Sequence, residues 1–352
     1  MKDTKIYKFD KDKIDINIIK ESGKALKEGK TVVFPTETVY GLGGNIYCED
    51  TLSKIYEAKG RPADNPLIVH IWDISQLKEL VEEIPENAKI LMNKYWPGPL
   101  TIIFKKNKNL PDYITRGLDT VAVRMPNNPI ALKLLEESGV PVAAPSANTS
   151  GKPSPTIGRH VVEDLNGKVD IIIDGGSCKI GLESTVIDVY STPLMILRPG
   201  GITLEDIIED IKNVVYDPSL MQVSSIINPK SPGQKYKHYS PKAQLFLFTG
   251  DIKNVKNKIK NKTEEMTKEG KKVLIMTSKE NVPYYDKGII LNLGSRKDYK
   301  TISSNIFKAL RKADELNVDV ILSESFDEKG LGKAIMNRLI KASGQNIVNC
   351  GD

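Results

Sequence analysis

The sequence has no continuous run of about 18 apolar residues, the minimum expected for a membrane-spanning helix. Residues 1–15 also lack the apolar stretch of a secretory signal. The three cysteines, Cys48, Cys178 and Cys350, are widely spaced and odd in number, which argues against a disulfide framework. These absences predict a cytoplasmic protein that does not associate with membranes.

Several familiar site motifs are absent as well. The chain has no GxxxxGK[ST] phosphate loop, and GLGGNI (41–46) lacks the last glycine of GxGxxG. It contains no GxSxG elbow, no kinase signature set, and neither CxxC nor HxxxH. An ATP site in this chain must therefore be of another design, and no metal held by protein side chains is expected.

The positive charge is concentrated in one part of the chain. The net charge is +6, yet residues 1–242 hold 31 Lys and Arg against 31 Asp and Glu, whereas residues 243–352 hold 20 against 14. A polyanion site in the first part must therefore come from local arrangement and not from bulk charge. The Lys-rich second part is interpreted as a solvated helix face, with weak RNA binding left open.

Strand-like and helix-like segments alternate, which predicts an α/β protein. The strands expected first are residues 31–34, 67–71, 100–104, 120–125, 169–174 and 184–190. Helical periodicity recurs at residues 15–28, 50–59, 86–95 and 129–138. The second of these helices would leave Lys59 and Arg61 at its end, facing outward into a loop.

The chain is long enough for two domains with separate cores. After RPGGIT (198–203), residues 213–242 contain four prolines and no amphipathic period, as in a linker. A fresh strand and helix alternation follows. We therefore expect a first domain over 1–212, a linker over 213–242 and a smaller α/β domain over 243–352.

Two clusters in the first domain combine hydroxyl or cationic groups with turn residues. PTETVYGLG (35–43) either presents hydroxyls and backbone N–H groups to a ligand, or is a tight turn capped by a threonine. KGRPADNPLIVH (59–70) places two cations on a restrained loop, a pattern suited to phosphate oxygens. In the alternative, both cations are merely solvated and the histidine is structural.

Two further clusters follow strands. TVAVRMPN (120–127) places Arg124 inside an apolar strand, which is costly unless the guanidinium meets an anion. That anion is either an internal Asp or Glu or the carboxylate of a ligand. AAPSANTSGKPSPT (143–156) is either a flexible loop or a lining of small and hydroxyl groups that a nucleotide approaches closely.

These clusters together resemble one family. PTETVYGLG, KGRPxxNPLxxH, WPGPLT, VAVRxP and SANxSGxPSPT, followed by ESTVID and ILRPG, look like the YrdC-type threonylcarbamoyl-AMP synthases. The resemblance covers about residues 15–205 in the family's order. SPGQKYKHYSPKA (231–243) and the α/β tail resemble the two-domain branch. The resemblance implies a YrdC-like twisted mixed sheet with flanking helices, plus a smaller Rossmann-like C-terminal domain.

The resemblance also implies a nucleotidyltransferase. Threonine and bicarbonate would give N-carboxy-threonine, which attacks the α-phosphate of ATP and releases pyrophosphate. The product, threonylcarbamoyl-adenylate, would serve N6-threonylcarbamoyladenosine formation next to the anticodon of tRNA, with a downstream threonylcarbamoyltransferase machinery as partner. Mg²⁺ would be held by the phosphates. The rival hypotheses are a double-stranded RNA-binding module and a nucleotide sensor without turnover.

The family's site residues transfer to this chain one by one. The catalytic tetrad would be Lys59, Arg61, Ser146 and Asn148. Threonine would be held by Thr38, His70, Arg124 and Ser184. The ATP pocket would include Arg61, Asn65, Thr120, Ala144, Ser146, Ser154 and Arg198.

The linker resembles a flap over the active site. Its Tyr236 and His238 are then the candidates that reach nucleotide or bicarbonate. In the alternative interpretation, these residues only pin the linker to the surface.

Overall fold

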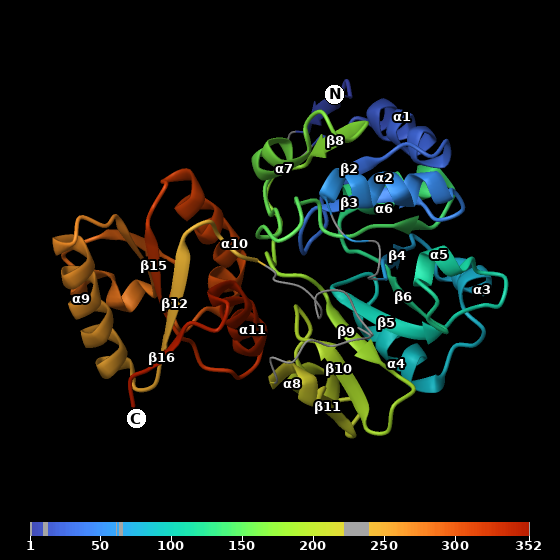
Figure 1. Cartoon of the computed structure of the whole chain (residues 1–352). Helices are drawn as coiled ribbons and strands as arrows, with labels where there is room; N and C mark the ends of the chain where they lie inside the picture. Colours follow the sequence, from blue (N-terminus) through green and yellow to red (C-terminus); the bar gives the residue numbers. More distant parts are fainter. Residues whose placement is uncertain (1, 10–12, 61, 63–65, 222–238, 352) are drawn as a thin grey trace. The chain divides into compact units, whose positions relative to one another are not determined.

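The computed structural model describes residues 2–9, 13–60, 62, 66–221 and 239–351 (Figure 1). The chain divides into two compact units. The first unit is Met1–Ser150 with Ser154–Tyr236, and the second is Gly151–Pro153 with Lys237–Asp352. Among the described residues, no helix is long and apolar enough to cross a bilayer.

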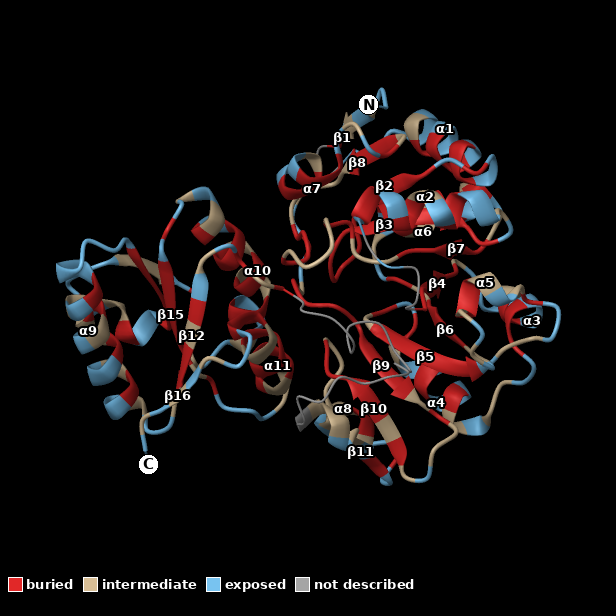
Figure 2. Cartoon of the chain, in the orientation of Figure 1, coloured by how far each residue is buried: buried red, intermediate tan, exposed pale blue. Residues whose placement is uncertain are grey.

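A mixed sheet forms the centre of the first unit, with strand order β1-β8-β2-β3-β7-β4-β6-β5-β9-β10-β11. Buried apolar residues dominate its central strands, which Figure 2 shows in red. The strands are β1 (Lys5–Lys8), β2 (Val32–Phe34), β3 (Gly41–Asn45), β4 (Ile68–His70), β5 (Leu100–Lys105), β6 (Thr120–Arg124), β7 (Val142–Ala143), β8 (Ile171–Asp174), β9 (Thr185–Asp188), β10 (Leu194–Arg198) and β11 (Val214–Tyr216).

Helices flank this sheet, as the alternating pattern predicts. They are α1 (Ile16–Lys27), α2 (Glu49–Lys59), α3 (Leu77–Leu80), α4 (Glu86–Tyr95), α5 (Asp112–Thr115), α6 (Pro129–Ser138), α7 (Gly158–Leu165) and α8 (Leu204–Ile208), with 3-10 turns η1 (Ile74–Gln76) and η2 (Pro218–Met221). Helix α1 packs closely on α6 because Gly23 has no side chain: a Cβ there would lie 2.8 Å from the backbone of Glu137. Asn128 caps α6 by accepting from the N–H groups of Ile130 and Ala131.

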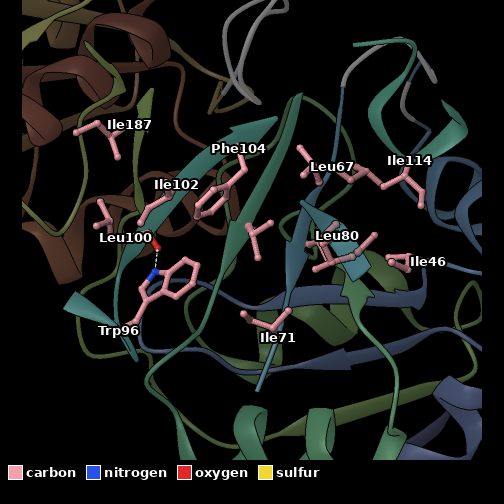
Figure 3. Packing of buried hydrophobic residues seen from close by; sticks show 14 of the residues in the cluster. Ile46, Leu67, Ile71, Leu80, Trp96, Leu100, Ile102, Phe104, Ile114 and Ile187 are labelled. Atoms are coloured by element: carbon pink, nitrogen blue, oxygen red, sulfur yellow. Dashed lines mark hydrogen bonds between the residues drawn. The ribbon is translucent and has the colours of Figure 1, made fainter. Parts of the chain in front are cut away.

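Large aliphatic and aromatic side chains fill the space between the sheet and these helices (Figure 3). Trp96, Leu100 and Phe104 are less than 9% exposed. The indole Nε1–H of Trp96 donates to the Leu100 carbonyl at 2.7 Å, which satisfies the polar group of a buried aromatic residue. Strand β5, which begins at Leu100, pairs antiparallel with β6, the strand that carries Arg124.

The PTETVYGLG cluster departs from the expected glycine-rich turn. Residues Gly41–Asn45 form the buried strand β3, antiparallel to β2. A Cβ on Gly44 would lie 2.5 Å from the Thr51 side chain, so only glycine lets α2 pack this closely. Glycine is common in turns, but here the glycines are part of a paired strand because they allow neighbouring elements to approach closely. The polar groups that remain for a site lie earlier in the motif.

The second unit is a parallel sheet of order β14-β13-β15-β12-β16, as expected for a Rossmann-like domain. Figure 1 shows α9 on one face of this sheet and α10 and α11 on the other. Its elements are β12 (Gln244–Thr249), α9 (Ile252–Lys268), β13 (Val273–Thr277), η3 (Lys279–Tyr284), β14 (Ile289–Asn292), α10 (Tyr299–Glu315), β15 (Val320–Glu324), α11 (Leu331–Ser343) and β16 (Ile347–Asn349).

The segment expected as a linker is structured at both of its ends. Strand β11 pairs in parallel with β10, so residues 214–216 belong to the first sheet. At the other end Tyr239 is 4% exposed and stacks on Phe307 with ring centroids 5.1 Å apart. A linker over 213–242 is therefore too long at both ends. The sequence of this segment has no strand-like alternation, so β11 is recognised only from its pairing with β10. Residues 222–238 lie outside the described part of the chain.

Candidate active site

Three loops of the first unit meet through backbone hydrogen bonds. The carbonyl of Tyr40 accepts from the N–H of Ala147, and the N–H of Leu42 donates to the carbonyl of Pro145. These bonds join the segment 35–43 to the hydroxyl-rich segment 143–156. Ile180 donates to the carbonyl of Glu37, which joins the loop before β9. Polar residues from segments more than 100 positions apart are thereby gathered at one end of the sheet.

Arg124 at the end of β6 forms an ion pair with Glu37. Its Nη2 donates to Oε1 of Glu37 at 2.6 Å, and both side chains are about 5% exposed. Nη1 donates to Oγ1 of Thr38 at 2.9 Å, and Nε donates to the Gly98 carbonyl. The internal partner that the sequence left open is therefore Glu37, and the buried charge is compensated.

These contacts do not use all the N–H donors of the Arg124 guanidinium. Each of Nη1 and Nη2 carries two N–H groups, and the hydrogen bonds above use one of each. Within the described residues, Arg124 thus keeps one open N–H on each terminal nitrogen. Glu37 is itself held in place, because its Oε2 accepts from the backbone N–H of Asn127. Two N–H groups of a fixed guanidinium therefore remain for a further acceptor, and a carboxylate is an acceptor that arginine prefers.

His70 lies beside Arg124 as its partner in the parallel pairing of β4 with β6. Burial, together with the adjacent positive charge of Arg124, lowers the pKa of His70 to about 3. The ring is therefore neutral at physiological pH. Its Nδ1 lies 3.2 Å from the Ile68 carbonyl, which can only accept, so Nδ1 carries the proton and Nε2 is an acceptor.

Ser184 continues this polar row on the other side of β6. Thr101 is the cross-strand partner of Arg124, and its hydroxyl lies 2.8 Å from Oγ of Ser184. Arg198 donates to both the carbonyl and the hydroxyl of Ser184 at 3.0 Å. All of these side chains are buried. The structure thus joins a predicted threonine contact to a predicted ATP contact through direct hydrogen bonds.

Lys59 differs from the expectation that it faces outward. The side chain is buried, and Nζ donates to the carbonyls of Ser146 and Asn148 at 2.5 and 2.7 Å. The Ser146 hydroxyl donates to the Asn148 side chain at 2.6 Å. Helix α2 ends at Lys59, and the next residue, Gly60, is in the left-handed region and turns the chain there. Three members of the predicted tetrad are therefore in contact.

Three further ATP candidates have different surroundings. The hydroxyl of Ser154 donates to Glu183 at 2.5 Å, and both residues are buried. Ala144 is buried, and its N–H donates to Ile68. Thr120 starts β6, about 13 Å from Arg124 at the rise of an extended strand. It lines a separate pocket of about 440 Å³ and is not gathered with the others. Its role at ATP stays a prediction.

Four predicted site residues lie outside the described part of the chain: Arg61, Asn65, Tyr236 and His238. Their assignments to catalysis and to the nucleotide stay predictions. Among the residues that are described, no group of three or more His, Cys, Asp and Glu side chains could hold a metal ion.

Sequence reasoning missed three polar residues of this site, Glu37, Thr101 and Glu183. Each lies within a motif that carries the family resemblance, and Glu37 and Glu183 directly precede the chosen residues Thr38 and Ser184. The available signal was a carboxylate or hydroxyl among small residues in an otherwise apolar context. Because all three act on other side chains, only the folded structure shows their partners.

Comparisons with known proteins agree with this architecture. Residues 24–200 match the model of the Sua5, YciO and YrdC family, described as telomere recombination. Residues 202–344 match the C-terminal domain of threonylcarbamoyl-AMP synthase. A threonylcarbamoyl-AMP synthase of Pyrococcus abyssi is 51% identical over 92% of this chain and 93% of its own length. One of Bacillus subtilis is 46% identical over 94% of each.

A solved structure resembles the whole chain. The crystal structure of Pyrococcus abyssi Sua5 complexed with L-threonine has a TM-score of 0.92 and 48% identity, and the match covers 98% of this chain and 99% of that one. Sequence and fold thus agree over both units. The chain belongs to the Sua5, YciO and YrdC family and is an enzyme of the nucleotidyltransferase type.

Proposed function

We propose that this enzyme joins L-threonine, bicarbonate and ATP into L-threonylcarbamoyl-adenylate, with release of pyrophosphate, in the cytoplasm. The observation that carries the proposal is the pair of open N–H groups on Arg124 beside the neutral ring of His70. Support comes from a relative of 48% identity whose structure was solved with L-threonine. The product would be passed to a tRNA threonylcarbamoyltransferase machinery that forms N6-threonylcarbamoyladenosine next to the anticodon.

Threonine fits the polar row around Arg124. The two open N–H groups of the guanidinium would receive the α-carboxylate as a bidentate pair. Nε2 of His70 is an acceptor and would take a hydrogen bond from the substrate's hydroxyl or amine. The hydroxyls of Thr38 and Ser184 lie in the same buried row and complete the set of donors and acceptors. Burial would exclude water from the labile intermediates that follow.

The reaction requires positioning more than a covalent protein nucleophile. The amine nitrogen of threonine forms a bond to the carbon of bicarbonate, and water leaves. The new carboxylate then attacks the α-phosphorus of ATP. The bond from that phosphorus to the bridging oxygen breaks, and pyrophosphate departs. Fixed cations that face the phosphates would stabilise the charge that develops there.

The ATP side of the site would be built on the loop that Lys59 holds. By fixing the carbonyls of Ser146 and Asn148, Lys59 sets the shape of a lining that a nucleotide can approach. Arg198, buried against Ser184, would bring a second cation between the two substrates. Arg61, with Asn65, Tyr236 and His238, remains assigned to the nucleotide by resemblance. Mg²⁺ bound to the phosphates would neutralise part of their charge.

The direct test is pyrophosphate release from ATP by the full chain. We expect release only when threonine and bicarbonate are both present, together with a threonylcarbamoyl-adenylate product seen by mass spectrometry. A nucleotide sensor or a double-stranded RNA-binding module would bind its ligand without this turnover. Absence of threonine-dependent release from a protein that binds ATP would reject the proposal.

Variants at Lys59 test its role in that assay. Lys59→Ala should lower kcat by roughly ten- to a hundredfold and weaken the binding of ATP. The reason is that a buried, charge-assisted contact with the loop that holds Ser146 is lost. Lys59→Arg should restore little, because a planar fork does not fit between carbonyls 2.5 and 2.7 Å from one nitrogen. Lys54→Ala, five residues earlier on the same helix and more exposed, serves as the control.

A further inference from the structure

The second unit has a pocket of its own, of about 300 Å³, lined by residues that follow its strands. Thr249 and Gly250 follow β12, Arg296 follows β14, and residues 325–328 follow β15. In open α/β sheets, ligands bind outside the carboxyl ends of the strands, where helices leave toward opposite faces. Strands β12 and β15 are such neighbours, since α9 and α11 lie on opposite faces (Figure 1).

Arg296 is fixed in this pocket by a fully buried carboxylate. Its Nη2 donates to Oε2 of Glu324 and to the Ser325 carbonyl, both at 2.9 Å. Its Nε donates to the hydroxyl of Ser278, and its guanidinium stacks on the ring of Phe326. An arginine held by this many contacts has lost its conformational freedom before any ligand arrives, which favours binding.

Glu324 is itself held by several hydrogen bonds. It is completely buried and accepts from the side chains of Thr277, Ser278, Asn281 and Tyr285 as well as from Arg296. A buried carboxylate is costly unless it is paired in this way. Both carboxylate oxygens of Glu324 already accept hydrogen bonds from residues of the second unit, so Glu324 is not itself a ligand contact. Its effect is to aim Arg296.

Arg296 keeps donors for a ligand. Its side chain is 26% exposed, and within the described residues its Nη1 donates no hydrogen bond. Both N–H groups of Nη1 are therefore available to an acceptor in the pocket. Since the guanidinium is positively charged and planar, the preferred acceptor is a carboxylate or a phosphate.

The remaining charges of the pocket disfavour a phosphate. Asp327 forms no ion pair within the described residues, and one of its oxygens accepts only from the N–H of Lys329. Glu328 is already paired with Lys333. Asp251 caps α9 with its own carboxylate, which occupies the N–H groups where a phosphate would sit at that helix. A dianion would meet these negative charges, whereas a cationic group would be attracted to Asp327.

We propose that this pocket binds a free α-amino acid with an apolar side chain. Its carboxylate would pair with Nη1 of Arg296, its ammonium group would face Asp327, and its side chain would contact Ile252, Phe326 and Met336. The volume suits such a molecule, since pockets of about 300 Å³ are at the small end of ligand sites. The proposal is independent of the threonine site of the first unit.

The test is equilibrium binding of L-leucine, L-valine and L-methionine to the full chain, by saturation-transfer NMR followed by calorimetry. We expect at least one of them to bind in the millimolar range or tighter. N-acetyl-L-leucine and L-leucinamide should bind about tenfold more weakly or not at all, because each lacks one of the two charges.

Variants locate the site. Asp327→Asn and Arg296→Gln should each weaken binding by about tenfold or more. Asp286→Asn, an exposed carboxylate of the same unit outside the pocket, should bind like the parent. Asp327 is exposed, so its variant stays informative even if Arg296→Gln unfolds. No binding by any probe, equal binding by Asp327→Asn and the parent, or binding of inorganic phosphate in place of amino acids would overturn the proposal.

Discussion

The two units each contain a buried carboxylate that clamps an arginine, and they use it differently. In the first unit, Glu37 and Arg124 are both about 5% exposed, and a neutral histidine lies alongside. In the second, Glu324 is completely buried and Arg296 is 26% exposed, with the ring of Phe326 beneath it. The same pair thus forms an enclosed site in one unit and the edge of a pocket in the other.

The difference follows from where each arginine originates. Arg124 is the last residue of a central strand, so neighbouring strands and loops enclose it. Arg296 belongs to a loop after β14, at the edge of the sheet, and its side chain stays 26% exposed. Enclosure favours chemistry that needs water excluded. Partial exposure favours a ligand that exchanges freely with solvent.

Removal of the carboxylate should have the largest effect on stability. Glu324→Ala leaves the Arg296 side chain and several buried donors without their acceptor, and should destabilise the second unit by about 3–5 kcal/mol. Glu37→Ala should do the same in the first unit, by less, because fewer donors depend on it.

Hydrogen–deuterium exchange of the full chain reads the two units separately, which a single unfolding curve cannot do. Faster exchange confined to the altered unit is the expected pattern. Unchanged protection in Glu324→Ala would mean that the buried network adds no net stability.

Loss of the first arginine should change substrate binding. Arg124→Ala should raise the KM for threonine by roughly 10- to 100-fold while that for ATP changes much less, because a charge-assisted fork to the carboxylate is lost. Steady-state kinetics with each substrate varied in turn measures this.

Arg124→Lys keeps the charge against Glu37 and guards against a folding defect. Arg159→Ala, an exposed arginine on α7, is the control. If both KM values rose equally in folded Arg124→Lys, the assignment to threonine would fail.

The neutral histidine makes the first unit sensitive to acid. The pKa of His70 is about 3 in the folded chain and about 6.5 when unfolded, so the unfolded state binds more protons between these values. The free energy of unfolding should therefore fall as the pH drops through this window, by about 2 kcal/mol from pH 6 to pH 4.5.

Comparison with His70→Gln isolates this contribution from that of the carboxylates. In the variant, the free energy of unfolding should depend less steeply on pH. It is measured by urea unfolding, with hydrogen–deuterium exchange of the first unit as the readout. Parallel curves for parent and variant would contradict the low pKa.

The smallest expected effect concerns the start of α6, where the side chain of Asn128 bonds only the helix and neither ion pair. Asn128→Ala removes the cap of α6 and should destabilise the first unit by about 1 kcal/mol, with no change in either KM. Asn128→Asp keeps an acceptor for the N–H groups of Ile130 and Ala131 and should behave like the parent. A loss of activity in Asn128→Ala would show that α6 also positions the site.

Local pattern alone predicted most of the elements. Alternating apolar segments located β2, β4, β5, β6, β8 and β9 and the helices α1, α2, α4 and α6, because side-chain period depends only on neighbouring residues. The order of the motifs identified the family, and the strand position of Arg124 demanded a buried anion. Short strands such as β7 and β11 were missed because pairing, and not their own sequence, stabilises them.

Tertiary structure decided which groups meet. The sequence holds 45 Asp and Glu residues, and nothing local marks Glu37 as the partner of a residue 87 positions away. It could not show that Lys59 turns inward, since that depends on carbonyls in a loop far along the chain. It gave no sign that Glu324 would aim Arg296. Charges in an interior are paired by long-range contacts, and those contacts exist only once the chain has folded.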